Sequence, residues 1–322
     1  MSGWQEEGSR ELSRFIVRRL LYALVALIGA TMLVFGLSRL VGDPRDLYIQ
    51  EGGYGTSPET RAVLEKQLNL DKPLPLQYGI WLGRVLKGDL GNSVFTRIPV
   101  SRQIRESAPR TLKLGLVSWV LATGMGIPLG IVAAVYRGTM WDKLARGFAL
   151  LGQAAPPFWI GIMGILLFSV QLRWLPAGTE GEGLAIRNFI MPAFTLGWLS
   201  SAGYMRITRS AMLEVLDSEF VKLARAKGVG RTTVVWKHAF RNALIPPLTI
   251  SALLLAGFIT GAVVVETVFA WPGMGRLAVD AVSNNDYPLM TGTVLVFAAV
   301  YLVMNLLTDI AYAFIDPRIR YS

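Results

Sequence analysis

The chain alternates long apolar runs with shorter polar segments, and several runs approach the roughly 20 residues that a helix needs to cross a bilayer. We expect six transmembrane helices, at residues 20–37, 112–135, 148–172, 189–204, 244–269 and 289–312. The predicted fold class is therefore an all-α integral membrane protein. Residues 1–40 would hold the N-terminus and the first helix, residues 41–110 a long extracytoplasmic segment, and residues 111–322 a core of five transmembrane helices.

Two of these predicted helices contain residues that favour close packing or a bend. Gly126 and Gly130 are spaced as G-x-x-x-G, which lets a neighbouring helix approach closely, and helix packing is their expected role. Pro156 and Pro157 lie inside the third predicted helix, where proline removes backbone donors and bends the chain. Gln153 precedes them by one turn, so it either lines a solute pathway or belongs to a packing kink.

Two carboxylates lie near the ends of predicted helices, and a carboxylate within a span is a candidate functional group. Glu266, near the outer end of the fifth helix, is a candidate gate residue, although a hydrated position near the lipid headgroups fits it better. Asp309, toward the inner end of the sixth helix, either serves the pathway or reaches water or a basic partner at the inner face. Trp271 is expected at the membrane interface, where tryptophan is enriched.

Composition and charge narrow the class of protein further. The chain has 322 residues, 52% of them hydrophobic, and a formal net charge of +10. Basic residues gather in loops beside the apolar runs, which predicts cytoplasmic loops and contact with membrane lipid rather than with nucleic acid. Both termini are then cytoplasmic. With no cysteine and a single histidine, His238, the chain offers no disulfide, no thiolate ligand and no multi-histidine metal site.

The longest polar interruption in the second half of the chain is the segment 213–244. Its apolar residues keep helical spacing on both sides of Gly228-Val229-Gly230, which predicts two short amphipathic helices with a break there. We expect a compact or left-handed backbone at Gly228. The segment is basic, which favours a cytoplasmic location. It either presents a folded face to a cytosolic partner or is a solvated basic loop that only sets the topology.

Two stretches of the sequence resemble a known family. The loop reads EFVKLARAKGVGRTTVVWKHAFRNALIP, and a later segment reads ETVFAWPGMGRL. Both are similar to the B-type permeases of the dipeptide, oligopeptide and nickel importers, which are inner-membrane components of binding-protein-dependent ABC transporters. The resemblance covers almost the whole chain and implies the type I ABC importer permease fold. It departs at Lys222, where the family motif has a glutamate, and Glu219 is the nearest carboxylate.

In such permeases the loop docks on an ATPase subunit and transmits its motion to the membrane helices. The resemblance therefore implies an ATPase-coupling surface made of Glu219, Lys222, Leu223, Ala224, Arg225, Ala226, Lys227, Gly228, His238, Arg241 and Asn242. It also implies the partners: a second homologous permease, two ABC ATPase subunits that bind ATP and Mg, and an extracytoplasmic substrate-binding protein. The chain itself would bind no cofactor and would lie in a bacterial or archaeal cytoplasmic membrane.

We find no catalytic or nucleotide-binding motif in the sequence. The stretch AKGVGRTT only superficially resembles a phosphate-binding loop, because Arg231 stands where that motif needs a lysine. We therefore expect a non-enzymatic permease subunit that moves di- or oligopeptides. Nickel chelates, glutathione and oligosaccharides are alternative solutes within the same class. A secondary transporter is a further alternative, and it would need ionisable groups inside the membrane to couple ions.

Overall fold

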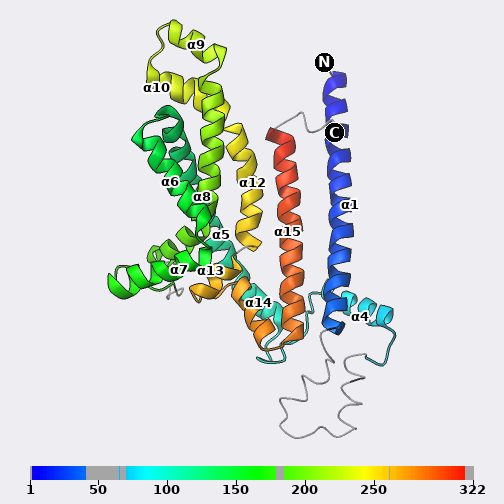
Figure 1. The fold of residues 1–322 in the computed structure, drawn as a ribbon. Helices are drawn as coiled ribbons and strands as arrows, with labels where there is room; N and C mark the ends of the chain where they lie inside the picture. Colours follow the sequence, from blue (N-terminus) through cyan, green and yellow to red (C-terminus); the bar gives the residue numbers. More distant parts are fainter. Residues whose placement is uncertain (1, 41–64, 66–69, 179–184, 261, 316–322) are drawn as a thin grey trace. The chain divides into compact units, whose positions relative to one another are not determined.

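The computed structural model describes residues 2–40, 65, 70–178, 185–260 and 262–315, and this part of the chain is helical, with no β-strand (Figure 1). The predicted all-α fold class is confirmed. The chain divides into two compact units, one made of Met1–Arg110 and Gly273–Leu306, the other of Thr111–Pro272 and Leu307–Ser322.

The first unit contains the N-terminal helix and the segment that follows it. Its helices are α1 (Ser2–Leu40), α4 (Leu74–Leu86), the first part of α5 (Val100–Val135), α14 (Met274–Ser283) and most of α15 (Tyr287–Ile315). Aromatic rings hold α4 on α1, because the ring centre of Phe35 lies 5.6 Å from those of Tyr78 and Trp81. A hydrogen bond of 2.8 Å between the hydroxyls of Thr31 and Tyr78 joins the same two helices.

A buried carboxylate fixes the start of α15 in the first unit. Asp286 is 1% exposed, and its Oδ1 accepts a hydrogen bond of 3.1 Å from the Leu289 N–H, which caps the helix. Its Oδ2 accepts hydrogen bonds from the Ser93 hydroxyl and from the Phe95 N–H, the latter at 3.3 Å. The segment before α5 is thereby joined to the turn between α14 and α15.

The second unit is built around α8. Its elements are the rest of α5, α6 (Met140–Ala154), α7 (Pro157–Gly164), the π-helical segment η1 (Ile165–Gln171), α8 (Ile186–Leu216), α9 (Glu219–Ala226), α10 (Arg231–Thr233), the π-helical segment η2 (Val234–Phe240), α11 (Arg241–Ala243), α12 (Ile245–Thr260) and α13 (Val263–Val268). The helices α6, α7 and α12 and the segment η2 all pack against α8.

Glycines allow α5 and α8 to lie in close contact. A Cβ added to Gly126 would lie 2.5 Å from the Ser201 carbonyl oxygen, and one added to Gly130 would lie 2.6 Å from the Thr208 Cβ. A Cβ on Gly197 of α8 would likewise lie 2.9 Å from a carbonyl oxygen of α5. Since these distances leave no room for a side chain, the predicted G-x-x-x-G packing is confirmed.

The third predicted transmembrane helix is divided into two helices. The axes of Met140–Ala154 and Pro157–Gln171 differ by 104°, and Figure 1 shows α7 leaving the direction of α6. Pro156 has extended backbone angles, and Pro157 is the first residue of α7, where the missing N–H of proline breaks no hydrogen bond. The two prolines therefore produce the predicted bend, as a break between helices rather than a kink within one.

Three helices in the described part of the chain are long and apolar enough to cross a membrane: Ile16–Gly36, Val100–Val135 and Tyr287–Thr308. If the bent pair Met140–Ala154 and Pro157–Gln171 is a single crossing, the described residues contain four such spans. α12 has only 16 residues, and α8 carries serine, glycine and asparagine among its apolar residues. The number of six crossings stays a prediction.

Candidate functional site

The loop that the sequence singled out folds into two helical segments at the end of α8 (Figure 1). Residues 227–230 separate α9 from α10, and Gly228 has the left-handed φ of +78°. Its N–H donates to the Arg225 carbonyl at 3.0 Å, and the Val229 N–H donates to the Ala224 carbonyl at 3.2 Å. This pair of bonds is the Schellman motif that ends many helices. The two-helix prediction and the left-handed Gly228 are both confirmed.

The second half of the loop packs on α5 and α8. Ala239 of η2 and Ala243 of α11 are fully buried, in one apolar cluster with Ile131 of α5 and Met212 of α8. Each fully buried side chain in such a cluster contributes on the order of 1 kcal/mol or more. η2 and α11 are therefore packed firmly against α5 and α8.

Two polar contacts also join the loop region to the end of α5 and the residues that follow it. The guanidinium of Arg231 donates to the Val135 carbonyl at 3.3 Å and lies 5.2 Å from the ring centre of Tyr136, a cation–π contact. Arg137, after α5, lies 3.7 Å from Asp217 at the end of α8, with both side chains exposed. The exposed Arg137–Asp217 pair contributes little energy.

The outward face of α9 is apolar at its centre. Val221 is fully buried beneath the helix, whereas Phe220 and Leu223 are 47% and 57% exposed. They lie three residues apart, so they are neighbours on one helical face. Lys222 pairs with Glu219 at 2.8 Å, and both side chains are exposed. The positive charge of Lys222, which replaces the motif glutamate, is thus neutralised by Glu219 within α9. The outward face of α9 presents the two apolar side chains of Phe220 and Leu223.

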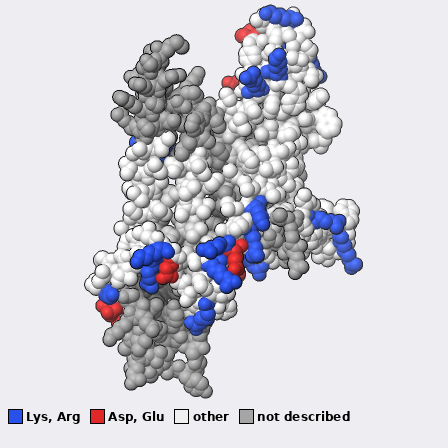
Figure 2. All heavy atoms as spheres, turned by 180° about the vertical axis from the view of Figure 1, so that it is seen from behind, with Lys and Arg blue, Asp and Glu red and all other residues white. Residues whose placement is uncertain are grey.

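The remaining predicted coupling residues occupy both halves of the loop. Ala224 is half-buried, and Arg225, Ala226 and Lys227 are exposed at the end of α9. His238 is half-buried on η2, and its carbonyl accepts a hydrogen bond of 2.7 Å from the Asn242 side chain. Arg241 and Asn242 are exposed on α11. Figure 2 shows lysine and arginine side chains gathered over this end of the second unit, with few acidic ones.

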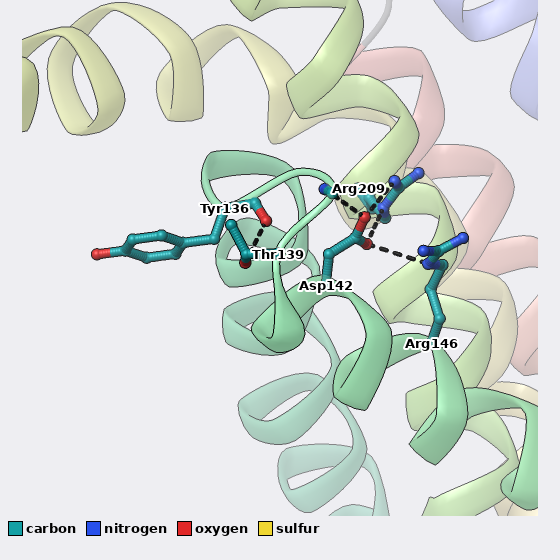
Figure 3. A network of polar contacts seen from close by, with 6 residues as sticks. Tyr136, Thr139, Asp142, Arg146 and Arg209 are labelled. Atoms are coloured by element: carbon teal, nitrogen blue, oxygen red, sulfur yellow. Dashed lines mark hydrogen bonds and ion pairs between the residues drawn. The ribbon is translucent and has the colours of Figure 1, made fainter.

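A buried carboxylate that the sequence did not point to lies where α6 meets α8 (Figure 3). The side chain of Asp142 is 2% exposed, and Arg209 donates to both its oxygens, from Nε at 2.9 Å and from Nη2 at 3.1 Å. Arg146 lies 3.2 Å from Oδ1, and the Gly138 N–H donates to Oδ2 at 3.0 Å. One carboxylate therefore joins α6, α8 and the turn after α5.

The local sequence around Asp142 contains only a weak signal for this ion pair. Between Arg137 and Arg146, Asp142 is the single acidic residue in a basic stretch, which reads as a charged cytoplasmic turn. Its partner Arg209 is 67 residues away, and no local pattern connects the two.

A second polar contact that was not predicted joins three helices. The Tyr204 hydroxyl of α8 donates to the Ser251 hydroxyl of α12 at 3.0 Å. The Trp119 indole N–H of α5 donates to the same hydroxyl at 3.0 Å. Tyr204 is fully buried and Ser251 is 5% exposed, so these bonds form away from water and fix the relative positions of the helices.

The predicted pathway residues are divided between separate elements. Gln153 is exposed in the last turn of α6, Pro156 is exposed in the break, and Pro157 is half-buried at the start of α7. α7 packs against α13, which carries Glu266. Asp309 belongs to α15, but its side chain lies outside the described residues.

Glu266 and Trp271 lie in the protein interior. Glu266 is 0% exposed, and one of its carboxylate oxygens accepts a hydrogen bond of 2.6 Å from the Thr111 hydroxyl, so the expected hydrated position is wrong. Trp271 is also 0% exposed, with its ring 4.8 Å from that of Phe189, so the expected interface position is wrong too. The Thr111 hydroxyl offsets part of the cost of burying the Glu266 carboxylate, and Trp271 gains from packing against the Phe189 ring. Within the described residues, no cluster of histidine and carboxylate side chains could hold a metal ion.

Two family models match this chain, each over a different part of the sequence. Residues 126–321 match the family described as binding-protein-dependent transport system inner membrane component, and residues 12–115 match the N-terminal family of such membrane components. The dipeptide transport system permease protein DppB of Escherichia coli (strain K12) is 39% identical over 338 residues, which cover 96% of this chain and 99% of that protein. The di/tripeptide transport system permease protein DppB of Pseudomonas aeruginosa (strain UCBPP-PA14) is 38% identical over 334 residues, with 96% and 99% covered.

Solved structures show the same fold at low sequence identity. A chain of the MetNI methionine ABC transporter in an inward-facing conformation has a TM-score of 0.55 at 15% identity, covering 66% of this chain and 96% of that one. A chain of an amino acid ABC transporter crystallised with histidines has a TM-score of 0.52 at 17% identity, with 68% and 94% covered.

Proposed function

The chain belongs to the family of binding-protein-dependent transport system inner membrane components, and we propose that it is the permease subunit of an ATP-driven importer of di- and oligopeptides. The proposed substrate class rests on one observation, which is the near full-length match to a dipeptide permease, at 39% identity over 96% of the chain. The family is one of transport permeases rather than catalytic subunits. Nucleotide chemistry then belongs to partner subunits.

The proposed topology has six crossings of a bacterial cytoplasmic membrane, with both termini in the cytoplasm. The apolar helices within α1, α5 and α15 supply three crossings, and the bent pair α6–α7 with η1 supplies a fourth. α8 and the α12–α13 run supply the other two, since each contains an apolar run of the sequence. In this arrangement residues 41–110 are extracytoplasmic, residues 111–322 form the core, and the loop 213–244 is cytoplasmic.

The proposed mechanism begins at the loop. Two ABC ATPase subunits bind ATP and Mg, and their closure displaces the surface formed by residues 219–228 with His238, Arg241 and Asn242. The buried cluster between η2, α5 and α8 passes the displacement to the membrane helices. Asp142 extends it to α6 through its bonds with Arg209. The energy comes from the higher affinity of ATP for the closed ATPase dimer.

The solute pathway lies between this chain and a second homologous permease, and an extracytoplasmic binding protein delivers the peptide. Gln153, Pro156 and Pro157 border the pathway in this proposal, because Gln153 and Pro156 are exposed, and Pro157 is partly exposed, at the break between α6 and α7. Glu266 instead holds α13 on α5 through Thr111, because its side chain is buried. Asp309 stays a prediction.

The proposal is tested by isolating the tagged chain from its native membrane in mild detergent and reconstituting the material into vesicles. We expect a second permease and ATPase subunits with Walker motifs to co-purify, and dipeptide uptake to require ATP. A chain that purifies alone and drives uptake from an ion gradient would refute the importer assignment.

A further inference from the structure

The loop 213–244 borders a pocket that lies between α9, the turn after it, η2 and the ends of α5 and α8. The pocket has a volume of about 330 Å³. Its apolar wall is made of the aliphatic side chains of Val135, Leu216, Val229, Val234 and Val235. Leu216, Val234 and Val235 are at most 9% exposed, so this wall is part of the packed interior of the loop. The volume is at the small end of ligand-sized cavities, which suits one or two side chains better than a solute molecule.

Two guanidinium groups complete the pocket, and no carboxylate among the described residues lines it. Arg225 comes from the last turn of α9, and Arg231 from the first residue after the turn. Arg231 is already bonded to the Val135 carbonyl and lies over the Tyr136 ring. The Arg225 guanidinium forms no hydrogen bond or ion pair with any described residue, so its five donors are available at the edge of an apolar wall.

The apolar wall and the available guanidinium together indicate which kind of side chain the pocket can bind. An apolar wall binds an apolar side chain, and an available guanidinium at its edge binds a carboxylate by two parallel hydrogen bonds. We propose that this pocket receives an acidic residue, together with an adjacent apolar side chain, from the ATPase subunit. The inference rests on the proposed function and deepens it: the ATPase would insert a side chain into the loop, in addition to receiving the exposed face of α9.

The position of the pocket favours a cytosolic protein over a lipid headgroup. The apolar run of α8 ends before Arg206, and Leu216 in the pocket wall follows ten residues later. At the rise of an α-helix this is about 15 Å along the axis. The pocket also shares α9 with the exposed Phe220 and Leu223, so a partner that covers these two residues lies beside it.

The test uses the full complex of the chain with its partners, reconstituted in vesicles of neutral phospholipid. Arg225→Gln removes the available guanidinium, and Lys237→Gln removes another exposed positive charge of the same loop that does not line the pocket. We expect Arg225→Gln to weaken retention of the ATPase subunits about tenfold or more, and Lys237→Gln to change it less than about threefold. Val229→Phe, which fills the pocket without changing charge, should act like Arg225→Gln.

A second experiment identifies the occupant. In the Arg225→Glu background, each surface aspartate and glutamate of the ATPase is replaced by arginine, and recovery of binding is measured. Recovery by one acidic position, seen with Arg225→Glu but not with Lys237→Glu, supports the proposal. Equal losses for Arg225→Gln and Lys237→Gln, or no recovering position, overturn it.

The lipid alternative and the proposed function have separate readouts. If Arg225→Gln keeps the ATPase but loses co-purified anionic phospholipid, the occupant is a lipid and the proposal is overturned. If the unaltered chain retains no ATPase subunit, the proposed function itself fails, which no Arg225 variant would show.

Discussion

Asp142 of α6 and Arg209 of α8 form a two-point ion pair, with N–O distances of 2.9 and 3.1 Å, although they are 67 residues apart in the sequence. The carboxylate is almost fully buried and the arginine is mostly buried. A buried pair of this kind contributes less through its own attraction than through the cost of leaving one partner alone. The pair therefore fixes the position of α6 relative to α8.

Asp142→Asn should destabilise the second unit by about 3 kcal/mol, because Arg209 would keep its charge without a counterion. Arg146→Gln, at a half-exposed partner of the same carboxylate, should cost no more than about 1 kcal/mol. Thermal unfolding of the detergent-purified complex measures both. If the two variants unfold at the same temperature, Arg209 is not held by Asp142 in the way the geometry indicates.

Gly126→Ala should weaken the packing of α5 on α8. The added Cβ would lie 2.5 Å from both the Ser201 carbonyl oxygen and the Tyr204 Cβ, so the helices must separate. Overpacking of this kind costs about 1–3 kcal/mol. Gly124→Ala is the matched control, since a Cβ there meets nothing within 4 Å. The same unfolding measurement separates them, and an unchanged Gly126→Ala protein would show that the two helices are further apart.

Leu223→Ser should weaken binding of the ATPase subunits about tenfold while leaving the chain in the membrane, because it removes apolar surface from the outward face of α9. Leu144→Ser is the control: Leu144 is 58% exposed on α6, against 57% for Leu223, but lies outside the loop. Co-purification of the ATPase at increasing salt measures the effect. Equal retention by both variants would place the ATPase contact elsewhere on the chain.

Local sequence pattern predicted the features that depend on local chemistry. The two helices of the loop follow from apolar periodicity on either side of Gly228-Val229-Gly230, and the bend follows from Pro156 and Pro157. Glycine permits the left-handed backbone at Gly228 and proline restricts its own backbone, so both effects need no knowledge of distant neighbours. The 104° angle of the bend, in contrast, depends on what α7 packs against, and no sequence pattern specified it.

The features that were missed or mistaken depend on contacts between distant residues. Glu266 and Trp271 were expected in water and at the lipid interface, but packing of α13 and the following turn buries both. Their residue types favour a polar or interfacial position only when no partner is available. Thr111 and Phe189 supply such partners, from positions that the sequence does not connect to them.

Gly228→Val tests whether the loop couples ATP hydrolysis to transport. A β-branched side chain at φ of +78° costs about 1–2 kcal/mol, because its Cβ crowds the backbone in the left-handed region. This strain destabilises the Schellman turn that orients α9 relative to η2. The substitution changes no residue of the membrane helices. We therefore expect normal membrane insertion together with loss of substrate-stimulated ATP hydrolysis.

Gly230→Ala is the matched control for this variant, because Gly230 has the ordinary φ of −59° and a Cβ there meets nothing within 4 Å. It should hydrolyse ATP in response to substrate as the unaltered complex does. Substrate-stimulated ATP hydrolysis of Gly228→Asn should lie between those of Gly228→Val and Gly230→Ala, since asparagine tolerates the left-handed region better than valine. Normal stimulated hydrolysis in Gly228→Val, with the chain inserted and the ATPase bound, would show that the orientation of α9 does not carry the signal. Loss of stimulation in Gly228→Val and Gly230→Ala alike would implicate flexibility of the whole turn instead of its left-handed residue.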